Sequence, residues 1–170
     1  MKYRDFFSDL EYSLDERDNE MFDGFYCRIF PGLMRVEFVT DIPTQKKGID
    51  KILHFKSGKQ VTVDEKKRRE DYGDIALELR HEYDSGMVGK GWLYKCQCDY
   101  IVYAVMPSKK VYLLPALLLK KAWLTYRREW QQKYREINSP NKGYRSVSLP
   151  IPTQVLLESV SREMKQALTD

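Results

Sequence analysis

The stretch that decides the fold is residues 48–66, GIDKILHFKSGKQVTVDEK, which predicts two β-strands joined by a tight turn. Apolar side chains recur there with the two-residue period of a strand. They are Ile49, Leu53 and Phe55 on the first strand, and Val61 and Val63 on the second. The segment Ser57-Gly58-Lys59 between them contains a glycine, which can adopt positive φ in a turn. The stretch therefore predicts a β-hairpin.

The register of this hairpin follows from pairing the apolar faces of its two strands. The opposed pairs predicted in this way are Leu53 with Val63, Phe55 with Val61, Asp50 with Lys66, and Ile52 with Asp64. Asp50, Asp64 and Lys66 then share one face of the hairpin. A slip of one residue would bring Glu65 beside Asp50 and turn the valines to the wrong face. We therefore expect Asp64-x-Lys66, rather than Glu65-x-Lys67, to be the working pair.

A further acidic residue, Glu78, lies in the segment Asp74 to Tyr83, which alternates like a third central strand. Glu78 would join Asp50 and Asp64 at the polar end of the sheet. Converging carboxylates repel one another unless a cation lies between them, and hard oxygen ligands suit Mg²⁺ or Mn²⁺. A lysine next to the acids supplies positive charge where a phosphate or an attacking water would lie.

The spacing of Asp50 and Asp64-Glu65-Lys66 resembles the D…(D/E)xK signature of PD-(D/E)xK nucleases, the restriction-endonuclease-like superfamily. A narrower resemblance, to a group of bacterial and phage proteins, rests on Gln45-x-x-Gly48-Ile49-Asp50, Val63-Asp64-Glu65-Lys66, Leu77-Glu78-Leu79, Gly91-Trp92 and Asp99-Tyr100. It covers roughly residues 35–112, and this chain lacks the proline that often precedes the first acid. The resemblance implies an α/β fold, a restriction-endonuclease-like mixed β-sheet flanked by helices on both faces.

The function that the resemblance implies is metal-dependent hydrolysis of phosphodiester bonds, in DNA rather than RNA. It implies catalytic roles for Asp50, Asp64, Lys66 and Glu78. The implied Mg²⁺ or Mn²⁺ ligands are Asp50, Asp64, Glu78 and Glu65, the last through its backbone carbonyl. Lys66 would polarise the attacking water and neutralise charge in the transition state.

Predicted contacts to nucleic acid lie on either side of the hairpin. Gln45 precedes it, and Lys67, Arg68 and Arg69 follow the proposed catalytic lysine. Each has a simpler interpretation, since a lone glutamine is often a solvated polar residue and a charge run is often a solvated loop. The resemblance and the position beside the site favour contacts with phosphates.

Two alternatives stay open at this stage. The acids and the lysine can form a salt-bridged hairpin, in which an Asp50–Lys66 pair contributes only about 0.2–1 kcal/mol. The same fold can also serve as a catalytically silent module that binds nucleic acid or protein. Glu78 favours the nuclease, because a simple ion pair does not need a further acid.

Size and composition predict one domain over residues 1–170, with a core at about 34–137 and a C-terminal helix at about 153–168. The net charge of +4, from 29 basic and 25 acidic residues, does not by itself mark a nucleic-acid binder. We find no membrane-spanning run and no signal-peptide pattern. Three cysteines form no disulfide framework, so we expect a cytoplasmic protein. Homo-oligomers remain compatible with the sequence.

The remaining elements are predicted from periodicity and turn residues. They are a helix over 5–17, strands over 34–40, 98–106 and 111–114, a loop over 84–91, a helix from Pro115 to about Ile137, a linker over 138–143, a short edge strand over 144–148 and a helix from Thr153. Cys96-x-Cys98 does not predict zinc, because structural zinc needs four ligands and the chain has only two histidines.

Overall fold

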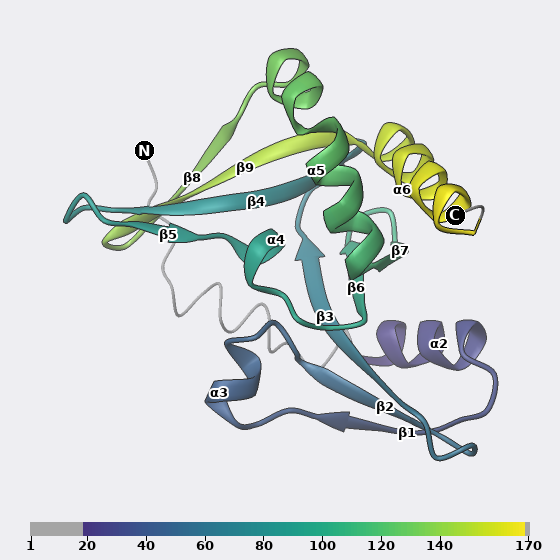
Figure 1. The fold of residues 1–170 in the computed structure, drawn as a ribbon. Coiled ribbons are helices and arrows are strands. Elements are labelled where there is room, and N and C mark those ends of the chain that lie inside the picture. Colours follow the sequence, from purple (N-terminus) through teal and green to yellow (C-terminus); the bar gives the residue numbers. More distant parts are fainter. Residues whose placement is uncertain (1–18, 169–170) are drawn as a thin grey trace.

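The computed structural model describes residues 19–168, and the helix predicted over 5–17 lies outside the described residues. Five helices and two β-sheets make up this part of the chain (Figure 1). The fold is thus mixed α/β, as expected. The prediction of a single sheet is wrong, because the strands divide between a mixed sheet and an antiparallel one.

The first sheet carries the predicted hairpin. Its strands, in spatial order, are β1 (Leu33–Phe38), β2 (Lys51–Phe55), β3 (Gln60–Arg68), β6 (Tyr100–Val105) and β7 (Lys110–Pro115). Only β3 and β6 run parallel to each other; the other neighbours are antiparallel. Two parallel strands must be joined by a long crossover connection. In this chain the connection from β3 to β6 contains strands of the second sheet.

The second sheet is antiparallel throughout. In spatial order it contains β5 (Val88–Lys90), β4 (Asp74–Tyr83), β9 (Tyr144–Pro152) and β8 (Ile137–Asn141). The predicted third central strand exists with its predicted bounds, but it belongs to this sheet. The predicted 84–91 loop contains β5 and the 138–143 linker contains β8. The predicted edge strand is the start of β9, which lies between β4 and β8.

These differences have a local physical reason. Segment 137–141 is polar and contains Pro140, so neither alternation nor composition marks it as a strand. Such a sequence is tolerated at a sheet edge, where a proline need not donate a ladder hydrogen bond. The apolar residues Leu149 and Ile151, in contrast, are fully buried because β9 is an interior strand.

The hairpin register is also corrected. Leu53 pairs with Val61 and Lys51 with Val63, a shift of two residues from the prediction. The turn is residues 56–58 rather than 57–59, since the Phe55 amide donates to the Lys59 carbonyl oxygen at 3.0 Å and Gly58 takes φ +79°. A shift of two preserves the alternation of faces, so the predicted clustering of the acids and the lysine survives.

The helices are α2 (Asn19–Ile29), α3 (Ile42–Gln45), α4 (Trp92–Lys95), α5 (Ala116–Lys133) and α6 (Thr153–Ala167). The two long helices predicted from Pro115 and Thr153 are confirmed as α5 and α6. α5 ends before the predicted Ile137, because the chain turns extended at Tyr134 and enters β8. Within the described chain no helix is long and apolar enough to cross a bilayer.

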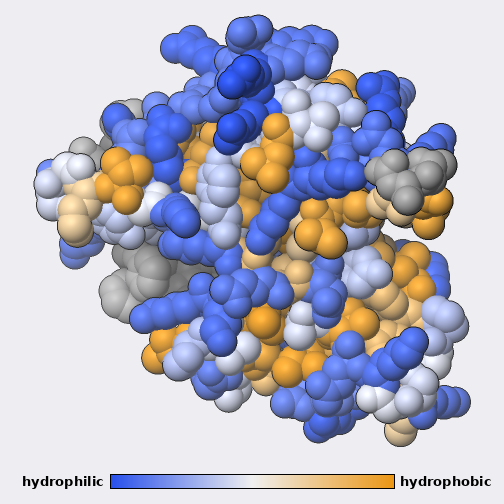
Figure 2. Space-filling model, viewed as in Figure 1, coloured by the Kyte–Doolittle hydropathy of each residue, from blue (hydrophilic) through white to orange (hydrophobic). Residues whose placement is uncertain are grey.

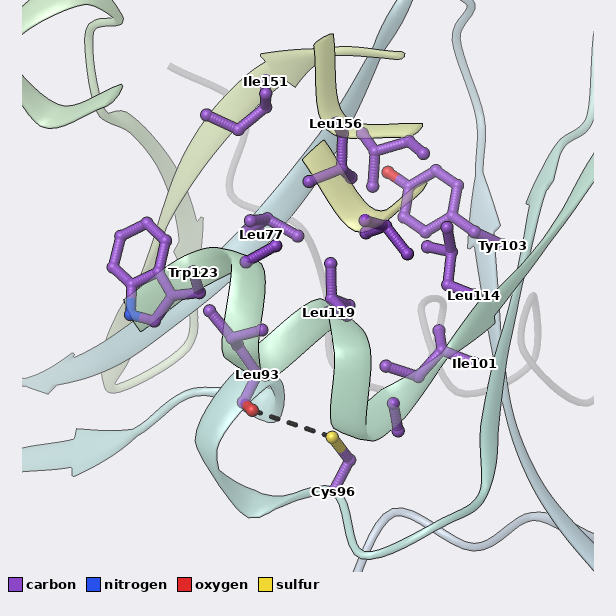
Figure 3. Close-up of a cluster of buried hydrophobic side chains, with 14 of the residues drawn as sticks. Leu77, Leu93, Cys96, Ile101, Tyr103, Leu114, Leu119, Trp123, Ile151 and Leu156 are labelled. Carbon is purple, nitrogen blue, oxygen red and sulfur yellow. Dashed lines mark hydrogen bonds between the residues drawn. The ribbon is translucent and has the colours of Figure 1, made fainter. Parts of the chain in front are cut away.

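The main core lies between the two sheets, α5 and α6 (Figure 3). The side chains labelled there come from both sheets, from three helices and, for Cys96, from the segment that follows α4: Leu77, Leu93, Cys96, Ile101, Tyr103, Leu114, Leu119, Trp123, Ile151 and Leu156. A second cluster lies on the opposite face of the first sheet, where α2 contributes Phe22, Phe25 and Tyr26. β3 is therefore covered on both faces, and its alternate side chains enter different environments.

The outer surface has one hydrophilic part and one part with exposed apolar groups (Figure 2). Hydrophilic side chains cover the end of the molecule formed by the C-terminal half of α5, whereas apolar groups are visible over the part that holds β1, β2 and α2. Met34, Phe38 and Ile42 are among the exposed apolar residues of that part.

Candidate active site

Asp50 lies directly before β2, and the backbone holds it against β3. Its amide donates to the Val63 carbonyl oxygen at 2.8 Å, and its own carbonyl oxygen accepts from Val39 at 2.9 Å. The carboxylate oxygen Oδ2 accepts a hydrogen bond from the Glu65 amide at 2.9 Å. Two backbone hydrogen bonds therefore fix the position of Asp50, and a third holds its carboxylate against β3.

Asp64 presents the most buried carboxylate of the site, with a side chain only 1% exposed. Its Oδ1 accepts from Lys66 Nζ at 2.5 Å. Its Oδ2 is buried and has no hydrogen-bond partner among the described residues. Buried polar atoms are nearly always satisfied, so this carboxylate oxygen calls for a further partner, such as a bound cation, a water or a proton shared with Asp50.

The loop that brings Asp50 to Asp64 requires glycine at position 48. Gly48 has φ +68°, and a Cβ there would lie 3.2 Å from Asp64 Oδ2 and 3.0 Å from the Cα of Cys96. Positive φ and close backbone approach both favour a residue without a side chain. Gly48 therefore lets three chain segments converge on Asp64 Oδ2.

The electrostatics of the site follow from this crowding. Burial raises the pKa of Asp64 to about 7; Lys66 opposes the shift and Asp50 adds to it. Burial alone would lower the pKa of Lys66, but the negative charges of Asp64 and Asp50 outweigh it and raise that pKa. The two carboxylates thus compete for one ammonium group. A further cation at this point would relieve the competition.

The residues fit a hard divalent cation that keeps most of its water. Mg²⁺ is commonly held by only one or two carboxylates and several waters. Asp50 and Asp64 supply two carboxylates, and Asp64 Oδ2 has no hydrogen-bond partner within residues 19–168. Across residues 19–168 the structure shows no group of three or more acidic, histidine or cysteine side chains that would enclose a metal.

Glu65 and Glu78 lie apart from this pair. The Glu65 side chain points to the opposite face of β3, where Oε1 lies 2.9 Å from Lys51 Nζ and accepts from the Tyr26 hydroxyl at 2.5 Å. Its carboxylate therefore cannot join Asp64, and only its backbone carbonyl was predicted to do so. Glu78 reaches toward the site from the second sheet, and its negative charge helps to raise the pKa of Lys66.

Glu78 is nevertheless tied to its own surroundings. Its Oε1 accepts from the Trp92 amide at 3.0 Å and lies 3.2 Å from His81 Nε2. Burial pulls the pKa of Glu78 upward, but these partners outweigh it and hold the pKa below its usual value. Glu78 is thus a charged residue at the border of the site.

Gln45 ends α3 and braces the loop that leads to the site. Its Nε2 donates to the Val39 carbonyl oxygen at 2.8 Å, and its own carbonyl oxygen accepts from the Gly48 amide at 2.9 Å. Gln45 therefore helps to set the path of the chain into Asp50. Its predicted contact with a phosphate stays a prediction.

The basic run after Lys66 is not a loop, because β3 continues through Arg68. Lys67 Nζ lies 5.8 Å from the centre of the Phe22 ring. Arg68 donates to Asp74 at 2.9 Å, and Arg69 follows the end of the strand. These contacts explain Lys67 and Arg68 as parts of the fold, and the phosphate-binding role of the run stays a prediction.

Sequence reasoning missed two neighbours of the site, Cys96 and Lys120. Lys120, on α5, donates from Nζ to the Cys96 carbonyl oxygen. A hydrogen bond with Cys98 lowers the pKa of the Cys96 thiol to about 6, and the charges of Lys120 and Lys66 lower it further against the effect of burial. No spacing in the sequence links position 120 to position 96, since only the docking of α5 brings them together.

Comparison of the chain with protein-family models, curated proteins and solved structures finds no significant match.

Proposed function

We propose that the protein is a Mg²⁺- or Mn²⁺-dependent nuclease that hydrolyses phosphodiester bonds in DNA. The observation that carries the proposal is the buried Oδ2 of Asp64, for which the described part of the chain provides no hydrogen-bond partner. Asp50 lies close enough to raise the pKa of that carboxyl, and Lys66 contacts it from the same face of β3. Two crowded acids with one ammonium suit a metal-assisted hydrolysis of an anionic substrate.

Asp50 and Asp64 would hold the cation, with the Glu65 carbonyl and Glu78 as the further ligands predicted from the family resemblance. When bound, the ion acts as a Lewis acid on a phosphoryl oxygen and lowers the pKa of coordinated water. Lys66 orients the attacking water and neutralises charge that develops on the phosphate. In this role its ammonium would exchange the Asp64 carboxylate, to which it now donates, for a substrate oxygen.

The proposal is tested by incubating plasmid and single-stranded oligonucleotides with Mg²⁺ or Mn²⁺, with and without EDTA. Wild type is compared with Asp64→Ala and Lys66→Ala. Lys56→Ala, in the exposed turn of the same hairpin, is the matched control. We expect metal-dependent cleavage by wild type and Lys56→Ala, and a loss of at least about 100-fold in the two site variants.

Other outcomes separate the alternatives. Equal cutting by wild type and both site variants would reveal a contaminating nuclease. If wild type and variants leave every substrate intact but bind DNA alike, hydrolysis is excluded and the catalytically silent binding module is favoured.

A further inference from the structure

A second ammonium group, that of Lys120, borders the candidate active site from α5. Its Nζ donates to the carbonyl oxygen of Cys96. The backbone of Cys96 in turn lines the site, since a Cβ on Gly48 would lie 3.0 Å from Cys96 Cα and 3.2 Å from Asp64 Oδ2. Lys120 therefore contacts the same short segment that lies against Gly48, next to Asp64.

Lys120 and Lys66 act on the same small volume. Both charges lower the pKa of the Cys96 thiol, after the larger effect of Cys98, so both ammonium groups lie within electrostatic reach of one sulfur atom. They differ in their partners. Lys66 donates to a carboxylate, whereas within residues 19–168 Lys120 donates to the Cys96 carbonyl oxygen and also hydrogen-bonds the Cys96 thiol, and neither of these partners is a carboxylate.

Among the described residues Lys120 is therefore not paired with a carboxylate, and its partners all belong to Cys96. A divalent cation on Asp50 and Asp64 would neutralise both carboxylates and leave two ammonium groups beside them. A hydrogen bond from an ammonium to a phosphate is charge-assisted and stronger than one to a neutral carbonyl. A phosphate at this point would therefore displace the Cys96 carbonyl as the partner of Lys120.

We propose that Lys120 and Lys66 together form a subsite for a phosphate of the nucleic-acid backbone, next to the position of the scissile bond. The inference rests on the proposed function, because it takes the substrate to be a phosphodiester. Lys120 contributes binding and orientation of the substrate rather than activation of water.

The first test measures binding of a fluorescein-labelled oligonucleotide by anisotropy, in Ca²⁺ and over a series of salt concentrations. We expect Lys120→Gln to raise Kd about tenfold. The slope of log Kd against log salt should fall by about one, because one phosphate contact is lost. Lys120→Arg should restore most of the affinity. Arg128→Gln, at an exposed position of the same helix, should leave both quantities close to wild type.

The second test uses Cys96 as a local probe. The ¹³Cβ chemical shift of Cys96 reports thiol ionisation in a buried position, whether or not a reagent can reach it. We expect Lys120→Gln to raise the pKa of Cys96, because a neighbouring cation is removed. Inorganic phosphate should raise the same pKa in wild type and have a smaller effect in Lys120→Gln.

The outcomes distinguish this subsite from the proposed reaction. One outcome is that wild type cleaves DNA, while Lys120→Gln has the same Kd and the same salt dependence as Arg128→Gln. This outcome would overturn the subsite and leave the proposed reaction standing. A weaker Kd with an unchanged salt slope and a lowered Tm would also overturn the subsite, because it indicates a structural role. If Lys120→Gln binds the oligonucleotide more weakly with a reduced salt slope, but wild type does not cleave it, the subsite is retained and hydrolysis is overturned.

Discussion

Asp64 is held in a state that costs the protein stability, and the cost depends on pH. Burial raises its pKa in the folded protein to about 7, above the value of 3.8 for an unperturbed aspartate. Below about pH 4 both folded and unfolded states are protonated at this residue, so no cost arises. As pH rises from about 4 to about 7, the unfolded state ionises first and gains stability relative to the folded state.

We therefore predict that Asp64→Asn is more stable than wild type above pH 7, by about 2 kcal/mol. The reason is that asparagine removes the ionisation that the folded state resists. The free energy of unfolding of wild type should fall between about pH 4 and pH 7, and the variant should lack most of this fall. Urea unfolding at several pH values measures both.

Asp84→Asn is the control, since this aspartate is exposed and should leave the pH dependence unchanged. Mn²⁺ should raise the Tm of wild type more than that of Asp64→Asn, because a bound cation replaces the missing partner. Identical pH profiles for Asp64→Asn and wild type would contradict the burial argument, and an equal response to Mn²⁺ would contradict the metal site.

At the scale of elements, α2 packs over a buried ion pair that joins two strands of the first sheet. Lys51 on β2 is 2% exposed, and its Nζ lies 2.9 Å from Glu65 Oε1 on β3. The rings of Phe22 and Phe38 lie 5.4 and 4.6 Å from the same Nζ, measured to their centres. The Tyr26 hydroxyl completes the group by donating to Glu65. This group holds the strand that carries Asp64 from its other face.

We predict that Glu65→Gln alone costs about 3 kcal/mol of unfolding free energy, because it leaves the Lys51 ammonium buried without a counter-charge. Lys51→Met together with Glu65→Gln should cost less than the sum of the two single changes, since neither charge is then left alone. Urea unfolding of all four proteins gives the coupling energy.

Lys59→Met is the matched control for the lysine, because Lys59 is exposed at the end of the hairpin turn. Strictly additive effects of Lys51→Met and Glu65→Gln would show that the two side chains do not interact. The pair would then be a coincidence of packing rather than a link between β2 and β3 under α2.

At the scale of the whole molecule, both sheets share one core. The strands of the second sheet are drawn from residues 74–90 and 137–152, on either side of the β6–β7–α5 segment of the chain. Trp123 and Trp130 are buried in the common core, and Trp92 packs against it. The chain therefore offers no segment boundary at which one sheet could unfold and leave the core of the other intact.

We expect urea unfolding followed by tryptophan fluorescence and by far-ultraviolet circular dichroism to give coincident transitions. Leu149→Ala, in a fully buried position of β9, should cost about 3 kcal/mol and shift both signals together. Leu117→Ala, at a position 79% exposed, is the control and should change little. Separate midpoints for the two signals would show that the sheets unfold independently.

The alternation of residues 48–66 was sufficient to place Asp50, Asp64 and Lys66 on one face, although the predicted register was off by two. The reason is that side chains change faces with a period of two, so an even error leaves every face unchanged. The helices from Pro115 and Thr153 were also predictable, because apolar periodicity and helix-start residues are local signals.

Tertiary structure alone decided where β4 goes, and with it the place of Glu78. A strand with one apolar face can pair with any strand of complementary pattern, and nothing within residues 74–83 selects β9 over the hairpin. The same holds for Lys120, which reaches the site only because α5 packs across the shared core. Local periodicity determines faces and helices, whereas the choice among distant partners depends on the total burial of the folded chain.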